Sequence, residues 1–261
     1  FHNSGTALPS FVIGDSNGSI STPTAGTSNF RAGVNAGDSI TSGGNYNTVV
    51  GDEAGTALTT GDNNVAVGFE ALSSEDGHGN NVAVGYRSLK TMNAGAEGYT
   101  TAIGLDTGTS ITTGVRNTLM GSFTGDALTD ADFNVALGYA SLSGDTLGSK
   151  STAIGYETLL AQNFTTATDS HNTAVGYRAG TAVTTGDQNV LIGSLAGDAL
   201  TVGQKNVALG RSALTTDTKG SKSTAIGYSA LDSQNFTTAT DSHNTAVGHL
   251  AGLSVTTGVQ N

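Results

Sequence analysis

Asn172-Thr173-Ala174-Val175-Gly176 is one copy of a five-residue motif that recurs throughout this chain. With minor variants it places a glycine at Gly51, Gly68, Gly85, Gly104, Gly121, Gly138, Gly155, Gly176, Gly193, Gly210, Gly227 and Gly248. Eight of the intervals between these glycines are 17 residues long, one is 19 and two are 21. This period is too short for a helix pair and is typical of one solenoid turn. The sequence therefore predicts an all-β, parallel β-solenoid (β-roll) of about 12 to 13 coils over residues 45–261.

The coils are themselves grouped into blocks of four. The fourth residue after each motif glycine alternates between two glycines and two leucines: Gly55, Leu72, Leu89, Gly108, Gly125, Leu142, Leu159, Gly180, Gly197, Leu214, Leu231 and Gly252. Residues 163–176 and 235–248 are identical and lie 72 positions apart. Duplication of a four-coil block explains both patterns.

The motif has the alternation of a short strand. Thr173 and Val175 would share one face of the strand, with Ala174 on the other. We expect the first two to face the coil interior or a neighbouring chain, and the alanine to make a second close contact. β-Branched residues that run into a glycine predict a second strand in many coils, at residues 57–61, 110–114, 182–186 and 254–258.

Two rows of equivalent residues are expected to stack along the solenoid axis. An asparagine opens most motifs, and a structural amide ladder is predicted for Asn64, Asn81, Asn117, Asn134, Asn172, Asn189, Asn206 and Asn244. Aromatic residues follow several motif glycines and should stack at one corner: Phe69, Tyr86, Tyr139, Tyr156, Tyr177 and Tyr228. Packing explains this second row, although a tyrosine row could also grip sugars.

Composition restricts the function classes. The chain has 261 residues, no cysteine and a formal net charge of −11. Thiolate metal sites and disulfides are excluded, and neither nucleic acid nor membrane insertion is expected as a partner or role. The only prolines are Pro9 and Pro23, so the repeats contain none of the residue that cannot donate to a β ladder. We divide the chain into residues 1–44, which are a connecting segment or degenerate first coils, and the repeat domain 45–261.

A slender coil encloses little apolar volume. A lone rod would therefore have a small core for its length and would expose strand faces. We expect identical rods to associate in a parallel bundle closed by cyclic symmetry. The residues alone do not set the number of chains.

Three stretches carry a family resemblance: NTAVGYRAG (172–180), STAIGYSAL (223–231) and NVAVGYRSL (81–89). They resemble the head repeats of trimeric autotransporter adhesins, and similar runs occur in bacteriophage tail fibre proteins. The resemblance covers residues 45–261 and implies a left-handed β-roll in a homotrimer that binds surfaces. Coils of 17 residues are longer than those typical of the adhesin heads. The opening GTALPSFVIGDSNG (5–18) resembles segments that precede such repeats in fibres of marine tailed phages.

No residue pattern indicates catalysis. The five histidines form no His-Glu-x-x-His motif, and no Gly-x-Ser-x-Gly elbow is present. An enzyme acting on polysaccharide would need acidic pairs from adjacent chains in one groove, and no spacing identifies such a pair. Residues 15–18 are interpreted as a turn rather than a calcium loop. Duplication explains the repeated Asp-Ser-His at 169–171 and 241–243, which would hold an ion only if copies met at a symmetry axis. We expect no catalytic residue, metal or cofactor.

The best binding candidates lie in insertions that lengthen every fourth coil, at residues 91–99, 161–171 and 233–243. These loops should bulge from a rigid scaffold, where binding residues commonly lie. The candidate receptor-binding residues are Met92, Tyr99, Asn163, Phe164, Asp169, His171, Asn235, Phe236, Asp241 and His243. For Phe164 and Phe236, folding back to cover the rod is an equally good interpretation.

The sequence favours an extracellular fibre segment of a tailed-phage virion that presents or forms a surface for a host glycan or protein receptor. The alternative is the head of a bacterial trimeric adhesin that binds matrix or partner cells. An ice-binding solenoid would need a regular threonine row, but Thr48 and Val65 already break it. Functional amyloid fits poorly with the insertions and the regular glycine corners.

Overall fold

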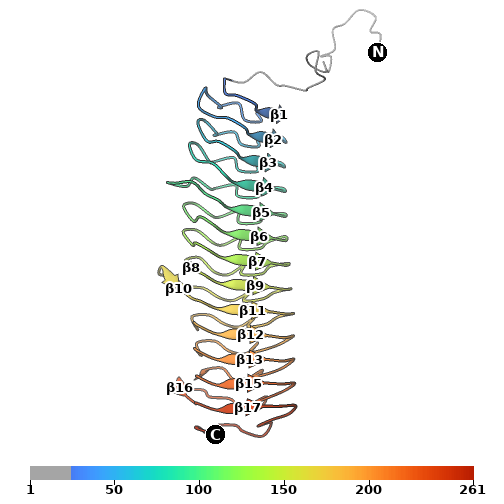
Figure 1. The fold of residues 1–261 in the computed structure, drawn as a ribbon, viewed down its shortest axis with the longest axis vertical. Helices are drawn as coiled ribbons and strands as arrows, with labels where there is room; N and C mark the ends of the chain where they lie inside the picture. Colours follow the sequence, from blue (N-terminus) through green and yellow to red (C-terminus); the bar gives the residue numbers. More distant parts are fainter. Residues whose placement is uncertain (1–24) are drawn as a thin grey trace, which may run out of the picture.

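The computed structural model describes residues 25–261, in which successive coils stack into one column (Figure 1). All regular elements of this part of the chain are strands, and thirteen of them form one parallel sheet in chain order. The predicted all-β parallel solenoid is thereby confirmed. The segment 5–18, the turn expected at residues 15–18 and both prolines lie outside the described residues. Within residues 25–261 no helix has the length and apolar character needed to cross a membrane.

The thirteen-stranded sheet contains β1 (Phe30–Ala32), β2 (Thr48–Val50), β3 (Val65–Val67), β4 (Val82–Val84), β5 (Thr101–Ile103), β6 (Thr118–Met120), β7 (Val135–Leu137), β9 (Thr152–Ile154), β11 (Thr173–Val175), β12 (Val190–Ile192), β13 (Val207–Leu209), β15 (Thr224–Ile226) and β17 (Thr245–Val247). Two small parallel sheets pair β8 (Gly148–Ser149) with β10 (Thr168–Asp169) and β14 (Gly220–Ser221) with β16 (Thr240–Asp241). Strand β1 pairs with β2 in the register Phe30 to Thr48. The ladder thus begins upstream of residue 45. From the sequence, this segment was expected to be either a connecting segment or degenerate first coils.

The outer residues of the motif strands face away from the coil interior, contrary to the first of the two orientations expected. From β2 to β17 the middle residue of each motif strand is buried, as Ala66 and Ala174 show, while the two outer residues are half-buried or exposed. The prediction that Thr173 and Val175 face the coil interior is therefore wrong. Nine of these twelve middle residues are alanines, which fit beside the large aliphatic side chains that enter from the other side of the coil, and the other three are Val49, Leu119 and Leu191. Contact of the outer residues with a neighbouring chain stays a prediction.

The predicted second strand is also wrong. Residues 57–61 and their equivalents form turns and bends. Leu58 donates its N–H to the carbonyl of Gly55, which bends the chain. Thr59 donates its N–H to the carbonyl of Asp76 in the next coil. Coil-to-coil bonding is kept at this side, but the turn leaves no extended run long enough for a strand.

The motif glycines are required by close stacking of the coils. At Gly138, φ is 129°, and an added Cβ would lie 2.2 Å from the carbonyl oxygen of Gly155 in the next coil. A side chain at this position therefore meets both backbone strain and a backbone clash. This requirement accounts for the invariant glycine in every coil.

The alternation of glycine and leucine pairs reflects two ways of filling the core. Where the fourth residue after the motif glycine is glycine, the seventh is aliphatic; where it is leucine, the seventh is Glu75, Met92, Asp145, Gln162, Asp217 or Gln234. A Cβ on Gly125 would lie 2.8 Å from Leu128 and 3.1 Å from Leu119. One large side chain is therefore accommodated at the expense of the other, and the four-coil block is a packing pattern.

Candidate functional site

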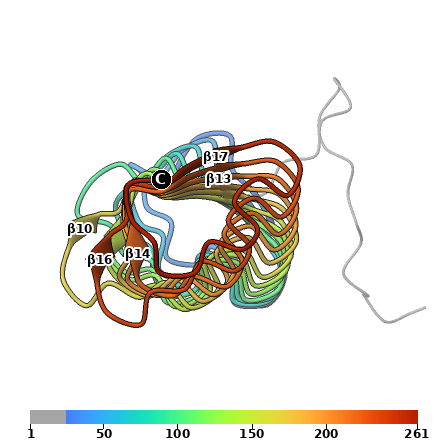
Figure 2. The same cartoon turned by 90° about the horizontal axis from the view of Figure 1, so that it is seen from below.

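The two longer insertions leave the column as bulges. Figure 2, which views the column along its axis, shows β10 and β16 outside the stacked coils. Residues 165–167 and 237–239 are exposed at the tips, and β10 and β16 return each bulge to the preceding coil by pairing with β8 and β14. The insertion at 91–99 contains no strand. The two identical bulges therefore give a rigid scaffold two similar projections.

Three of the candidate contact residues are buried. Met92 is fully buried, and the rings of Phe164 and Phe236 are 6% and 5% exposed. Backbone N–H groups of the two phenylalanines donate to Asp145 Oδ1 (3.0 Å) and Asp217 Oδ1 (3.1 Å). Exposure of these three side chains for a receptor was a wrong prediction. Each phenylalanine folds back and anchors its bulge, as the alternative interpretation held.

A buried polar network, which the sequence reasoning missed, supports each bulge. Gln234 Nε2 donates to Asp217 Oδ2 (2.6 Å) and to Ser223 Oγ (2.9 Å), and its Oε1 accepts from Asn244 Nδ2 (2.8 Å). Gln162, Asp145, Ser151 and Asn172 repeat this network in the preceding block. The signal in the sequence was a polar residue seven positions after the motif glycine, in five of the six coils with leucine at position four; Met92 is the exception.

The first block lacks the amide of this network. Glu75 takes the place of the aspartate and Met92 that of the glutamine. Glu75 is buried and accepts backbone N–H bonds from His78 (3.1 Å) and Ala94 (3.0 Å). Burial raises its pKa, and the two backbone bonds only partly oppose that shift. The carboxylate thus caps the local backbone in a poorly solvated position.

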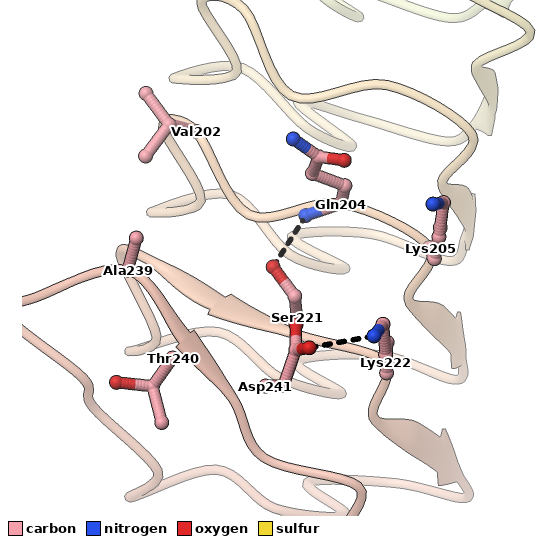
Figure 3. A pocket seen from close by; sticks show the side chains of 8 residues that line it. All are labelled: Val202, Gln204, Lys205, Ser221, Lys222, Ala239, Thr240 and Asp241. Atoms are coloured by element: carbon pink, nitrogen blue, oxygen red, sulfur yellow. Dashed lines mark hydrogen bonds and ion pairs between the residues drawn. The ribbon is translucent and has the colours of Figure 1, made fainter.

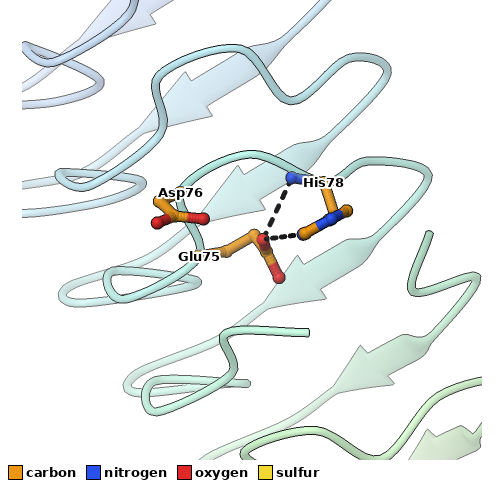
Figure 4. Close-up of side chains that lie close together, drawn as sticks. All are labelled: Glu75, Asp76 and His78. Atoms are coloured by element: carbon orange, nitrogen blue, oxygen red, sulfur yellow. Dashed lines mark hydrogen bonds and ion pairs between the residues drawn. The ribbon is translucent and has the colours of Figure 1, made fainter. Parts of the chain in front are cut away.

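Glu75 also belongs to a group with metal-ligating side chains. Glu75, Asp76 and His78 place one ligand atom each within 4.8 Å of one another. Figure 4 draws Glu75 between the other two, with His78 Nδ1 3.5 Å from its Oε1. Because the Glu75 carboxylate is already used by two backbone N–H groups, we interpret the cluster as a capping arrangement of the first insertion.

The remaining candidates lie at the surface in two places. Asp169 and Asp241 are exposed on β10 and β16 and form ion pairs with Lys150 and Lys222, the second at 2.6 Å. Asn163 and Asn235 accept bonds through Oδ1 from threonines of the preceding coil. The hydrogen bond from Lys222, together with the positive charges around it, lowers the pKa of Asp241. Asp241 therefore carries negative charge at neutral pH.

Tyr99, His171 and His243 lie on one corner of the column. Each directly precedes the first residue of a motif, is exposed, and has φ between 46° and 51°. The corresponding residue of every other coil also has positive φ, from Tyr46 to Gln260. The guanidinium of Arg116 lies 5.8 Å from the ring centre of Tyr99 and 5.4 Å from that of Phe133. The corner is therefore a row of variable exposed side chains on a constant backbone.

The asparagines form a continuous buried row. Asn189 N donates to Asn172 Oδ1 (2.9 Å), Asn189 Nδ2 to the carbonyl of Gly203 (2.9 Å), and Asn189 Oδ1 accepts from Asn206 N (3.0 Å). The same pattern joins the asparagines at 47, 64, 81, 117 and 134, with Thr100, Ser151 and Ser223 in the intervening coils. In this pattern the asparagine side chain bonds to the following coil and the backbone N–H bonds to the preceding one, while Asn81 Nδ2 has no hydrogen-bond partner among the described residues.

The aromatic row is exposed and stacked upon itself. Tyr139, Tyr156 and Tyr177 have neighbouring ring centres 5.4 and 5.5 Å apart, with planes within 13° of parallel. Phe69 with Tyr86 and Tyr228 with His249 form two further stacks, and Leu105, Ser122, Ser194 and Arg211 interrupt the row between the stacks. Within each stack the rings cover one another's faces, so a sugar can stack on a ring face only at the ends of a stack.

A polar hollow lies beside the second bulge (Figure 3). It is open to solvent, measures about 510 Å³ and is lined by Val202, Gln204, Lys205, Ser221, Lys222, Ala239, Thr240 and Asp241. Of these residues only Asp241 was predicted from the sequence as a binding candidate. Ala239 and Thr240 belong to the same insertion, and the other five lie in ordinary coils that only the fold brings beside the bulge.

Comparisons of the chain with family models, with curated proteins and with solved structures gave no match.

Proposed function

We propose that this chain is an extracellular, structural and adhesive segment of a tailed-phage tail fibre that presents a host-receptor-binding surface. The observation that carries the proposal is the unbroken column of thirteen paired strands with two identical projections on its side. At the usual strand spacing such a column is about 60 Å long, and it can hold a binding surface at that distance from its other end. The projections supply places for contact, as loops on rigid scaffolds do.

The proposed fibre is a parallel homotrimer in which three columns cover one another's sheets. The outward residues of the sheet form an aliphatic stripe that includes Met120 (43% exposed), Ile154 (36%) and Leu209 (42%). With three-residue strands the sheet face measures on the order of 600 Å². Monomeric proteins seldom leave an apolar patch of that size uncovered. Identical copies in parallel would match coil against coil along the whole stripe.

A head domain of a bacterial trimeric adhesin is the second candidate. The runs at 81–89, 172–180 and 223–231 favour it, because they resemble the head repeats of that family. The same column and projections would then contact matrix proteins or partner cells. The two candidates differ in the surface that is bound.

An adsorption experiment tests the proposal and separates the candidates. The purified chain, coupled to beads, is offered bacterial envelopes from a strain panel and, in parallel, surfaces coated with matrix proteins. Saturable adsorption to envelopes of particular strains supports the fibre, and adsorption to matrix alone supports the adhesin. Replacing residues 165–167 and 237–239 by Gly-Ser-Gly should reduce adsorption while the unfolding temperature stays unchanged. Failure to adsorb to any of these surfaces would contradict an adhesive role.

A further inference from the structure

We propose that the hollow beside the second bulge is a subsite for a hexuronic acid residue of an acidic glycan. The inference rests on the proposed adhesive function and assigns a ligand class to one place on the column. The carboxylate would bind Lys205, and the sugar hydroxyl groups would bind Gln204 and Thr240.

The floor of the hollow is formed by Val202, Gln204 and Lys205, and its wall by Ser221, Lys222, Ala239, Thr240 and Asp241. The wall is held rigidly. Ser242 N donates to the carbonyl of Ser221 (3.0 Å), which fixes β16 against β14, and Phe236 anchors the other end of the bulge in the core. The floor is tied to the wall because Gln204 N donates to Ser221 Oγ (3.1 Å). A preformed hollow of this kind avoids the entropic cost of ordering loops on binding.

The hollow offers free polar groups of the right kind. Gln204 and Lys205 are exposed, and neither side chain forms a hydrogen bond or ion pair with the described residues. Lys222 is paired with Asp241, and the positive charge of Lys205 also helps to lower the pKa of that carboxyl group. One carboxylate thus faces two ammonium groups, and the lining residues carry a surplus of one positive charge. An ammonium group with an adjacent amide and hydroxyl suits a ligand that carries a carboxylate beside hydroxyl groups. Val202 adds a half-buried apolar edge for the C–H face of a sugar.

The preceding block provides an internal control. The bulge at 163–171 is identical, and Lys150 pairs with Asp169 there as Lys222 pairs with Asp241. The floor residues 72 positions earlier are Asp130, Asp132 and Phe133 in place of Val202, Gln204 and Lys205. That side therefore has a surplus of negative charge, whereas the hollow has a surplus of one positive charge. An anionic ligand should distinguish two otherwise equal bulges.

The ligand is a saccharide rather than an acidic peptide because the lining combines a surplus of one positive charge with several hydroxyl and amide groups. A peptide of comparable acidity would favour clustered cations. The polar lining matches a ligand whose groups are mostly hydroxyl, with one charge per residue. The test therefore includes an acidic peptide as a competing probe.

Titration calorimetry on the full chain tests the subsite with short oligomers of galacturonate, mannuronate and hyaluronan. We expect at least one of them to bind at one site per chain, more weakly as salt increases. The carboxyl-reduced form of that oligomer should bind at least about tenfold more weakly, as should Lys205→Gln, since a charge-assisted hydrogen bond is lost. The triple variant Val202→Asp, Gln204→Asp, Lys205→Phe copies the other floor and should abolish binding. The reciprocal variant Asp130→Val, Asp132→Gln, Phe133→Lys should give two sites per chain.

The outcomes separate this inference from the proposed function. No binding of any uronate probe, an unchanged affinity of Lys205→Gln, or equal binding of a short polyglutamate would each overturn the subsite. If the wild-type chain still adsorbs to bacterial envelopes in those cases, the adhesive function stands without it. Circular dichroism of each variant shows whether the column is intact, and the reciprocal variant gives a gain of binding that misfolding cannot imitate.

Discussion

At the scale of the residue, the fold depends on a few backbone positions with left-handed conformation. The motif glycines have φ between 127° and 146°, while the residue two positions later has φ near 50° to 60° in coil after coil and is seldom glycine. The first position excludes any side chain because the next coil lies too close, but the second tolerates one at a modest cost. The two positions should therefore respond oppositely to mutation.

Gly138→Ala tests this difference. The added methyl group would lie 2.2 Å from the Gly155 carbonyl oxygen, so we expect a loss of several kcal/mol in the free energy of unfolding, or failure to fold. Ala140→Gly, in the same coil at φ 50°, should leave stability within about 1 kcal/mol of the wild type. Urea unfolding followed by circular dichroism measures both. Equal effects of the two changes would show that the close approach of the coils is not what requires the glycine.

Asn189→Ala tests the amide ladder. Removing the side chain leaves the Gly203 carbonyl and the Asn206 N–H without their buried partners, so we expect a loss of about 2 to 4 kcal/mol. Asn189→Ser should cost less, because Ser151 and Ser223 occupy equivalent places in other coils. The same unfolding assay measures the pair. A loss below about 0.5 kcal/mol for the alanine variant would mean that water replaces the ladder.

At the scale of the element, part of the coil was predictable and part was not. The glycine spacing predicted the solenoid turn, because every coil repeats the same backbone positions. The orientation of the strand was not predictable from alternation, since Thr173 and Val175 form as apolar a face as Ala174. Only the leucines that enter from the far side of the coil, such as Leu142, show why a small residue such as Ala136 fits in the middle of the strand, whereas Leu119 and Leu191 take that place in two coils with glycine at the corner.

Phe164→Ala with Phe236→Ala tests the anchoring of the bulges. Each ring is nearly buried, so each truncation should cost about 3 kcal/mol or more in the unfolding of its own coil. Hydrogen exchange should show faster exchange at residues 163–171 and 235–243. Thr165→Ala with Thr237→Ala, at the exposed tips, is the matched control and should change neither. Unchanged exchange after removal of both rings would contradict the anchoring role.

Met92→Gln tests the incomplete network of the first block through its pH dependence. Burial raises the folded-state pKa of Glu75 above the usual 4.5, so folded chains hold this proton more tightly than unfolded chains. The contribution of Glu75 to stability therefore falls as pH rises from that usual value through the raised pKa. A glutamine that donates to the carboxylate, as Gln234 does to Asp217, stabilises the charged form. Its gain should be absent below about pH 4.5 and reach about 1 kcal/mol or more at neutral pH.

The measurement is the difference in unfolding free energy between Met92→Gln and wild type across this pH range. Met92→Leu serves as the control, since it keeps the apolar volume and adds no donor. A difference that does not depend on pH would contradict the expectation that an amide donor at residue 92 stabilises the charged form of Glu75.

At the scale of the whole molecule, the column has a small interior and a long outward sheet face. The candidate site could be located only roughly from the sequence: the insertions are where the projections lie, but Met92, Phe164 and Phe236 point inward. Apolar residues in polar loops indicate a contact, but the sequence does not show whether the partner is the column itself or another molecule. The hollow at Val202 to Asp241 joins residues from successive coils, and no pattern within one coil could indicate it.

The outward sheet face is the surface through which we expect the chains to assemble. If the aliphatic stripe is the interface of a trimer, a lysine on it would be buried without a partner in each of three chains. We expect Met120→Lys with Ile154→Lys to dissociate the assembly while the coil-to-coil hydrogen bonds persist. Thr165→Lys with Thr237→Lys, on the exposed tips, should leave the assembly intact.

Light scattering with size-exclusion chromatography on the wild-type chain is the most direct test of the fibre. We expect the wild type to have a mass three times that of the 25.9 kDa chain, and the Met120→Lys, Ile154→Lys variant to have the mass of one chain. A well-folded wild-type monomer at micromolar concentration, with its outward sheet face in water, would contradict the trimer.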